Sequence, residues 1–291
     1  MKRIVLLAIL ALVSIVLPSC TEADIQTAGS ALGAFAGGFV PVSYSEMQDM
    51  SLCISAKIAG MYDIYNDPAL LKYVNMIAMT VGHYSDRPDF SYRVQLLNAP
   101  NEVNAFTTAD GRIFVTTGLL AAVQDESELA GVLGHEIAHA ARGHVAKAVA
   151  NERKKAGMVK AGGLVAQQYA PQYAQILTSV ADATFDAIAL RPRDRAQESE
   201  ADTYGMYYAE AAGYNPKGLL NFLSRLRNEE QSGGSAMTKI FDTHPDINQR
   251  VTDVSNSIAQ NFHPRENSPI MVQGATGKPI ERSQYFTASL K

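Results

Sequence analysis

The 291-residue chain is poor in cysteine: it has only Cys20 and Cys53, so a framework of several disulfides is excluded. It also has no stripe of basic residues, and its formal net charge is −4, which argues against nucleic acid as a partner. Internal repeats are absent, and this excludes repeat architectures. Hydrophobic residues make up 47% of the chain, enough for a globular domain with one core.

The N-terminus has the pattern of a targeting segment. Two basic residues precede an apolar run at 4–17, which is short for a transmembrane helix and suits a signal-peptide core. The run ends in Leu-Pro-Ser-Cys, which resembles a bacterial lipobox with Cys20 as the acylated residue, although Pro18 replaces the usual small residue. An acylated Cys20 would anchor the mature chain to a membrane. An aspartate at the next position would resemble an inner-membrane retention signal, and Thr21 stands there instead, so by this resemblance the outer membrane is favoured. The alternative is an ordinary signal peptide with an incidental cysteine.

Hydrophobic periodicity predicts a mainly helical chain with one small sheet, an α+β fold. The sheet includes a hairpin that turns at Asp110-Gly111. Asp125 is the expected N-cap of the helix that carries most of the histidines, with Glu128 completing a capping box. The expected helices cover about 45–65, 68–84, 125–155, 195–212, 215–230 and 244–260, and the expected strands cover 91–98, 102–108 and 112–118.

Composition divides the chain into four parts. Residues 1–19 form the predicted lipoprotein-type signal peptide, and residues 20–44, rich in alanine, glycine, serine and threonine, form a tether. Residues 45–262 form a single folded domain. Residues 263–291 contain several prolines and little pattern, so an extended or disordered tail is expected.

The stretch GHEIAHAARGH contains a metal-binding pattern. His135 and His139 are four residues apart, so both rings project from one face of a helix and can share a zinc ion. Glu136 lies beside them and is placed to activate a water molecule. The flanking residues are apolar nearly all round the helix, which indicates burial, and burying these groups is costly unless a metal or hydrogen bonds compensate.

The third ligand is not supplied by this helix. On a continuous helix His144 lies about 140° round from His139, so it faces away from the metal and is expected to make a surface or interface hydrogen bond. Downstream, Glu198 and Asp202 share one helical face, whereas Glu200 points elsewhere. Glu198 is therefore the expected third ligand.

Asp202 would accept the remaining ring N–H of a ligating histidine and so fix its tautomer. Gly205 and Ala201, near the same face, would allow a close approach to the histidine helix. A solvated acidic run is the alternative for this segment.

Several segments together resemble a known family, the gluzincin peptidases that include the CAAX prenyl endoprotease and the HtpX heat-shock protease. The matching segments are GHEIAHAARGH, ESEAD, NAFTTADGRIFVTTGLL and THPDINQR, which occur in the family's order. The resemblance is strongest to the family's periplasmic lipoprotein branch. It implies a zincin-like metallopeptidase domain over 45–262, in which the HExxH helix packs against the ExxxD helix and an edge strand lies over the cleft.

The resemblance also implies roles for individual residues. His135, His139 and Glu198 would hold one zinc ion, and Glu136 would activate water. The resemblance further implies roles for residues of the edge strand and of the segment THPDINQR.

Asn104 and Ala105, on the edge strand, would contact an extended peptide, with ordinary sheet structure as the alternative. His244 would approach the metal and either stabilise the oxyanion or cap the zinc in a closed state, unless it only starts a helix. Arg250 would bind a carboxylate of the site or the oxyanion.

The sequence thus predicts a zinc metalloendopeptidase that acts on polypeptides, with misfolded or misassembled envelope proteins as the substrates that the resemblance implies. The expected location is the periplasm, with a lipid anchor on Cys20 in the outer membrane. A homo-oligomer or an envelope-protein partner is left open. The alternatives are a zinc-stabilised chaperone or binding module, a latent protease held closed by His244, and a hydrolase of small amides.

Overall fold

The computed structural model describes part of the chain: residues 43–148, 150–151, 194–231, 244–261, 271–273 and 279–281, with Gln26 and Leu32 as single residues. The predicted signal peptide with Cys20, most of the predicted tether and most of the predicted tail lie outside the described residues. The chain divides into two compact units, and every named helix and strand belongs to the unit made of 42–148 and 186–291. That unit also contains every candidate site residue that the structure describes.

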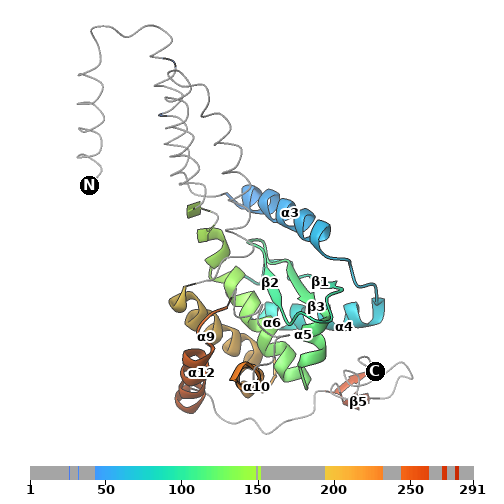
Figure 1. Ribbon diagram of the computed structural model, residues 1–291, viewed down its shortest axis with the longest axis vertical. Coiled ribbons are helices and arrows are strands. Elements are labelled where there is room, and N and C mark those ends of the chain that lie inside the picture. Colours follow the sequence, from blue (N-terminus) through green and yellow to red (C-terminus); the bar gives the residue numbers. More distant parts are fainter. Residues whose placement is uncertain are drawn as a thin grey trace, which may run out of the picture. The chain divides into compact units, whose positions relative to one another are not determined.

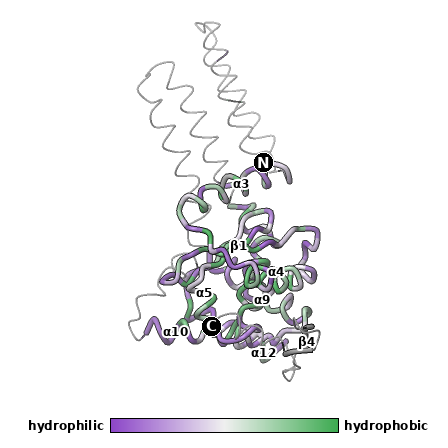
Figure 2. Tube along the Cα trace, turned by 90° about the vertical axis from the view of Figure 1, so that its right-hand side faces the viewer, coloured by the Kyte–Doolittle hydropathy of each residue, from purple (hydrophilic) through white to green (hydrophobic). Residues whose placement is uncertain are grey.

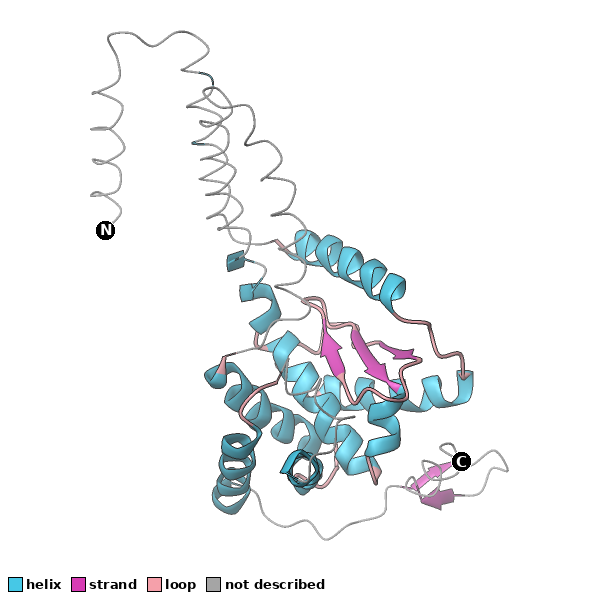
Figure 3. Cartoon of the chain, viewed as in Figure 1, coloured by secondary structure: helices cyan, strands magenta, loops and turns pink. Residues whose placement is uncertain are grey.

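The predicted α+β class is confirmed, because helices dominate the described unit and pack with a small three-stranded sheet (Figures 1 and 3). The helices are α3 (Tyr44–Met61), α4 (Pro68–His83), α5 (Thr117–Ala122), α6 (Glu126–Ala141), α9 (Arg195–Ala211), α10 (Lys217–Gln231) and α12 (Ile247–Asn261).

The sheet has three strands, β1 (Val94–Leu97), β2 (Ala105–Thr107) and β3 (Ile113–Thr116), in the order β1-β3-β2. The predicted hairpin is confirmed: β2 and β3 are antiparallel, and Gly111 in the turn has a φ of 90°, which suits a residue without Cβ. β3 pairs in parallel with β1, so β1 and β2 are the two edges of the sheet.

Helix starts follow the predicted capping chemistry. The side chain of Asp67 caps α4 just before Pro68. Asp125 caps α6 and accepts a hydrogen bond from the backbone N–H of Glu128 at 2.9 Å. In a capping box the carboxylate of Glu128 would accept from the N–H of the N-cap residue, Asp125. Here it accepts from the N–H of Gln124, one residue earlier, at 2.8 Å.

Helix α6 lies at the centre of the unit, in contact with α4, α9, α10 and β2. Every residue from 128 to 140 is buried, as its nearly continuous apolar surface predicts. Its neighbours differ in character: Figure 2 colours α4 largely as hydrophobic, whereas α10 and α12 are more hydrophilic and bury one face each. The histidines of α6 therefore lie in the interior of the unit.

Two glycines bring α6 and α9 into backbone contact. A Cβ on Gly134 would lie 2.5 Å from the carbonyl oxygen of Gly205, and a Cβ on Gly205 would lie 2.6 Å from the backbone nitrogen of His135. No larger residue fits at either position without moving a helix. The close approach predicted for Gly205 is confirmed, and it carries the acidic residues of α9 to the histidines of α6.

The expectation of one uninterrupted helix over 125–155 is wrong. α6 ends at Ala141, the chain turns at Arg142 and Gly143, and helical structure restarts at His144. Gly143 has a φ of 72°, a left-handed conformation that glycine adopts without steric cost. The turn changes the direction in which His144 points.

Six residues of the predicted tail form an antiparallel pair of short strands, β4 (Met271–Gln273) and β5 (Pro279–Glu281). Across the described residues, no helix is both long enough and apolar enough to span a bilayer.

Candidate metal centre

Three segments, two of them helical, bring four potential metal ligands together. His135 and His139 come from α6, Glu198 comes from the first turn of α9, and His244 lies just before α12. All four side chains are buried, and one nitrogen or oxygen atom of each lies within 4.8 Å of the others. The residues come from positions up to 109 apart in the sequence, so only the fold assembles them.

The separations between donor atoms suit a tetrahedral ion. Zinc bonds of about 2.0–2.1 Å at tetrahedral angles place neighbouring ligand atoms roughly 3.4 Å apart. Nε2 of His135 lies 3.0 Å from Nε2 of His139 and 3.1 Å from Nδ1 of His244. Oε1 of Glu198 lies 3.2 Å from Nε2 of His139, and its Oε2 lies 3.0 Å from Nδ1 of His244. The imidazole and carboxylate donors therefore fit zinc both in type and in spacing.

Glu136 faces the same space from α6. It is almost wholly buried, and its Oε1 lies 3.4 Å from Nε2 of His244. Its Oε2 has no hydrogen-bond partner among the described residues. A buried carboxylate oxygen without a partner costs free energy, of the order of 1–3 kcal/mol, unless a ligand or water satisfies it. The orphaned oxygen thus marks a place where a polar molecule is expected to bind.

Asp202 and Arg250 hold the outer side of His135. Oδ1 of Asp202 lies 2.8 Å from Nδ1 of His135, the nitrogen that faces away from the donor group. Arg250 donates to Asp202 from Nε at 2.8 Å and from Nη2 at 2.6 Å, a bidentate pair. Its Nη1 lies 3.1 Å from Oε2 of Glu198. One guanidinium therefore fixes two acidic residues that sit on the same face of α9.

The electrostatics keep these acidic groups ionised. Burial by itself raises the pKa of Glu198. The positive charges of His244, Arg250 and His135 lower it by more than burial raises it, so the pKa lies well below the ordinary range. Burial likewise opposes ionisation of Asp202, and Arg250 and His135 bring its pKa below the usual value. These two carboxylates need a compensating positive charge beyond Arg250, and a divalent cation would supply it.

His144 is buried, so the expected surface position is wrong. The turn at Gly143 brings its Nδ1 to 3.0 Å from Nδ1 of His139, on the side of that ring away from the donor group. Its Nε2 lies 3.1 Å from Oε2 of Glu200. His144 is not part of the four-donor group, and Glu200 points away from that group, as its helical position predicts.

A pocket opens beside the donor group, and the edge strand β2 contributes to it. Ala105 lines this pocket, whereas Asn104 does not. Asn104 is buried, and its side-chain amide donates to Oε1 of Glu102 at 3.2 Å. The structure therefore separates the two residues that the sequence treats as a pair. The pocket is lined by Ala105, Val132, His135, Glu136, Leu219, Phe222, Leu223, His244 and Arg250.

Two features of the site could not be read from residue patterns alone. The sequence brings His244 near the metal only through a family resemblance, and its place among the four donors depends on how α12 packs against α9 and α10. The contact between His144 and His139 depends on the break at Gly143. A glycine directly before a histidine is the one local signal for that break, because glycine tolerates a positive φ.

Comparison with known proteins gives a consistent result. The profile of peptidase family M48 matches residues 68–258, which contain α4 to α10, most of α12 and all the residues of the donor group. The Beta-barrel assembly-enhancing protease of Escherichia coli (strain K12) is 26% identical over 234 residues, covering 79% of this chain and 47% of that protein. Metalloprotease LoiP of the same organism is 28% identical over 192 residues, covering 65% of this chain and 70% of LoiP.

A more distant source also provides a relative. The mitochondrial metalloendopeptidase OMA1 of Arabidopsis thaliana is 33% identical over 161 residues, which is 55% of this chain and 30% of OMA1. The chain spans about half the length of the Beta-barrel assembly-enhancing proteases that it matches.

Proposed function

Since the chain belongs to peptidase family M48, we propose that it is a zinc-dependent endopeptidase that hydrolyses peptide bonds in polypeptide substrates. The observation that carries this proposal is the buried donor group directly beside the orphaned Oε2 of Glu136. A metal that only stabilised the fold would need the four ligands but no unsatisfied carboxylate facing them.

His135, His139 and Glu198 are the proposed metal ligands. Imidazole nitrogens and one carboxylate are typical donors for zinc, and three protein ligands leave one position for the reaction. Zinc in such a site would act as a Lewis acid, which lowers the pKa of a bound water toward neutral pH and polarises a carbonyl group. Asp202 accepts the Nδ1–H of His135 and so directs Nε2 of that ring to the metal.

Glu136 is the proposed general base. Its buried Oε2 would accept a proton from the attacking water and later pass the proton to the leaving amine. Arg250 has Nε, Nη1 and Nη2 engaged with Asp202 and Glu198. This supports a role for Arg250 in holding these carboxylates, which is one of the two roles expected for it, rather than in binding the oxyanion.

The substrate would bind as an extended peptide along β2. β2 has β3 on one side and is an edge of the sheet, and edge strands accept additional strands through their backbone groups. Ala105 lies at the pocket, so it is the proposed substrate contact. Asn104, buried against Glu102, would act by holding the start of β2 in place.

We further propose a periplasmic location, a lipid anchor on Cys20 in the outer membrane, and misfolded or misassembled envelope proteins as substrates. The support is the lipobox-like Leu-Pro-Ser-Cys sequence and the similarity to the Beta-barrel assembly-enhancing protease. A homo-oligomer or an envelope-protein partner would be compatible with this location.

A second candidate is a latent form of the same enzyme. Nδ1 of His244 lies 3.1 Å from Nε2 of His135 and 3.0 Å from Oε2 of Glu198, as a fourth ligand would. In this arrangement His244 would occupy the position that the reaction needs, and Nε2 of the same ring lies near Glu136. Withdrawal of the segment before α12 would then activate the enzyme.

The test of the peptidase activity compares the wild type with Glu136→Gln on an unfolded protein such as reduced casein. We expect wild-type cleavage into fragments and a loss of about 10²–10⁴-fold in the variant, with unchanged zinc content. Glu230→Gln, at an exposed position on α10, is the matched control and should cleave like the wild type.

Equal cleavage by the wild type and Glu136→Gln would refute the peptidase mechanism. Binding of unfolded protein without cleavage by either would instead support the chaperone alternative, once His244→Ala has excluded a latent form. Fragments from a long chain would exclude a hydrolase of small amides.

A further inference from the structure

His144 lies outside the four-donor group, yet it touches one of its members. Its Nδ1 is 3.0 Å from Nδ1 of His139, and the two rings meet edge to face with centroids 5.0 Å apart. The side chain of His144 is fully buried. A buried imidazole in this position contacts the proposed metal ligand on the side opposite to the metal.

The direction of each proton follows from the geometry. His139 presents Nε2 to His135 and Glu198, so Nε2 is its metal-binding atom. A neutral imidazole that binds a cation through Nε2 carries its proton on Nδ1. This N–H can donate to Nδ1 of His144 only if that atom is unprotonated. The proton of His144 then lies on Nε2, which donates to Oε2 of Glu200 at 3.1 Å.

Glu200 is held in place from its other side. Its Oε1 accepts from Nε of Arg142 at 2.7 Å, and Nη1 of Arg142 donates to Oδ2 of Asp86 at 2.7 Å. The guanidinium of Arg142 also stacks 4.2 Å from the ring centroid of Tyr204. Each oxygen of the Glu200 carboxylate therefore has its own donor, Arg142 on one side and His144 on the other. The chain of contacts thus starts at His139 and ends at the half-exposed Asp86.

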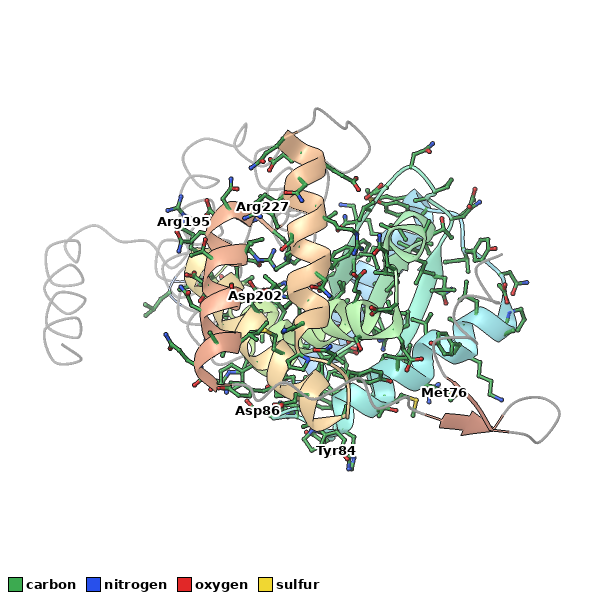
Figure 4. The ribbon with its side chains drawn as sticks, turned by 90° about the horizontal axis from the view of Figure 1, so that it is seen from below. Met76, Tyr84, Asp86, Arg195, Asp202 and Arg227 are labelled. Atoms are coloured by element: carbon green, nitrogen blue, oxygen red, sulfur yellow. The ribbon has the colours of Figure 1, made fainter. Side chains whose placement is uncertain are left out.

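The two histidines of the motif are therefore supported in different ways. His135 donates directly to Asp202, a buried carboxylate. His139 reaches a carboxylate only through a second imidazole, and this chain runs toward the edge of the described part, where Figure 4 labels Asp86. The left-handed turn at Gly143 is what permits the second arrangement.

We propose that His144 is a positioning residue: it accepts a hydrogen bond from the Nδ1–H of His139, donates its own Nε2–H to Glu200, and thereby holds Nε2 of His139 toward the metal. The inference rests on the proposed zinc site. It assigns a role to the third histidine of GHEIAHAARGH that is neither a ligand nor a surface contact. Groups that orient a metal-bound histidine in this way typically change metal affinity by about 10–100-fold when they are removed.

A purely structural role makes a different prediction. If His144 only filled space in the interior, a leucine of similar size would leave zinc binding unchanged. If it orients His139, the loss of its acceptor atom frees that ring to rotate, and zinc dissociates faster. Zinc affinity and the rate of zinc release, measured with a competing chromogenic chelator, separate the two cases and do not depend on proteolysis.

The experiment uses the full chain with His144→Leu, His144→Asn, Glu200→Ala and His83→Leu. We expect His144→Leu to weaken zinc binding by about 10–100-fold and Glu200→Ala, which removes the acceptor of His144, to weaken it less. His144→Asn should retain more affinity than His144→Leu, because its Oδ1 can accept from His139. The double variant with His144→Leu and Glu200→Ala should bind zinc no more weakly than His144→Leu alone, since both residues act through the one contact with His139. His83, exposed at the end of α4, is the matched control and should show no change.

Unchanged zinc affinity in folded His144→Leu would overturn the inference. Should that variant fail to fold, Glu200→Ala decides the matter, and wild-type zinc release in Glu200→Ala would overturn the inference as well. Failure of the proposed function looks different: a wild type that binds no zinc would remove both proposals. If the variants of His144 and Glu200 bind zinc with wild-type affinity and still show Glu136-dependent cleavage, only the positioning role of His144 is refuted.

Discussion

Glu198 and Glu200 are two residues apart on α9 but serve different histidines. Oε1 of Glu198 lies 3.2 Å from Nε2 of His139, inside the donor group. Oε2 of Glu200 lies 3.1 Å from Nε2 of His144, outside it. A helix rotates by about 200° over two residues, so neighbouring acidic side chains reach opposite sides of the same site.

The first prediction uses this pair. Glu198→Ala is expected to lose zinc affinity by more than about 100-fold because it removes a ligand, whereas Glu200→Ala should lose less because it removes only an outer support. Metal analysis at saturating zinc should find one zinc per chain in Glu200→Ala. Loss of zinc from Glu200→Ala together with full binding by Glu198→Ala would overturn the proposed ligand set.

The second prediction concerns His244. If its Nδ1 blocks the reaction position, His244→Ala should raise kcat/KM on an unfolded protein, by about tenfold if nine molecules in ten are closed. Zinc should remain bound through His135, His139 and Glu198. A fall in kcat with bound zinc would instead favour stabilisation of the oxyanion, and equal rates would rule out both roles.

The third prediction concerns the contact between α6 and α9. Gly205→Ala would place a Cβ 2.6 Å from the backbone nitrogen of His135, so the helices must separate. We expect a loss of about 1–3 kcal/mol in the free energy of unfolding, together with weaker zinc binding. Gly60→Ala, next to the last residue of α3, is the control. A Cβ there meets nothing within 4 Å, so we expect stability equal to that of the wild type or slightly higher. Denaturant unfolding measures both, and wild-type stability of Gly205→Ala would contradict the close approach.

The fourth prediction is a pH dependence at Tyr62, whose ring lies near Phe106 of β2. Burial and then Glu102, which accepts from the Tyr62 hydroxyl at 2.9 Å, raise the pKa of Tyr62 to about 12. In the unfolded chain the value is about 10. The folded state therefore holds this proton more tightly, and the stability gained is present below about pH 10 and is lost as the pH rises toward 12.

Tyr62→Phe removes this contribution. It should lower stability at neutral pH by about 1 kcal/mol and lose less stability than the wild type between pH 10 and 12. Absorbance titration of tyrosine ionisation should show one late-titrating group fewer. Tyr84→Phe, at an exposed position, should change neither the stability nor the number of late-titrating groups. A variant whose alkaline unfolding follows that of the wild type would refute the assignment.

Local patterns predicted much of the fold. The start of α4 at Asp67 and Pro68, the hairpin at Gly111 and the burial of α6 all depend on residues close in sequence, and each is confirmed. The parallel pairing of β1 with β3 was not predicted, because strand partners are chosen by packing over a whole sheet rather than by alternation within one strand.

The sequence by itself determined which side chains share a helical face: His135 with His139, and Glu198 with Asp202. Helical periodicity is a local property, so these relations hold wherever the helices lie. Only the tertiary structure decided which faces meet. The glycine contact between α6 and α9 brings the two pairs together, packing of α12 adds His244, and the left-handed turn at Gly143 returns His144 to His139. Each depends on contacts between segments far apart in the chain, or on one backbone conformation that the helical pattern does not reveal.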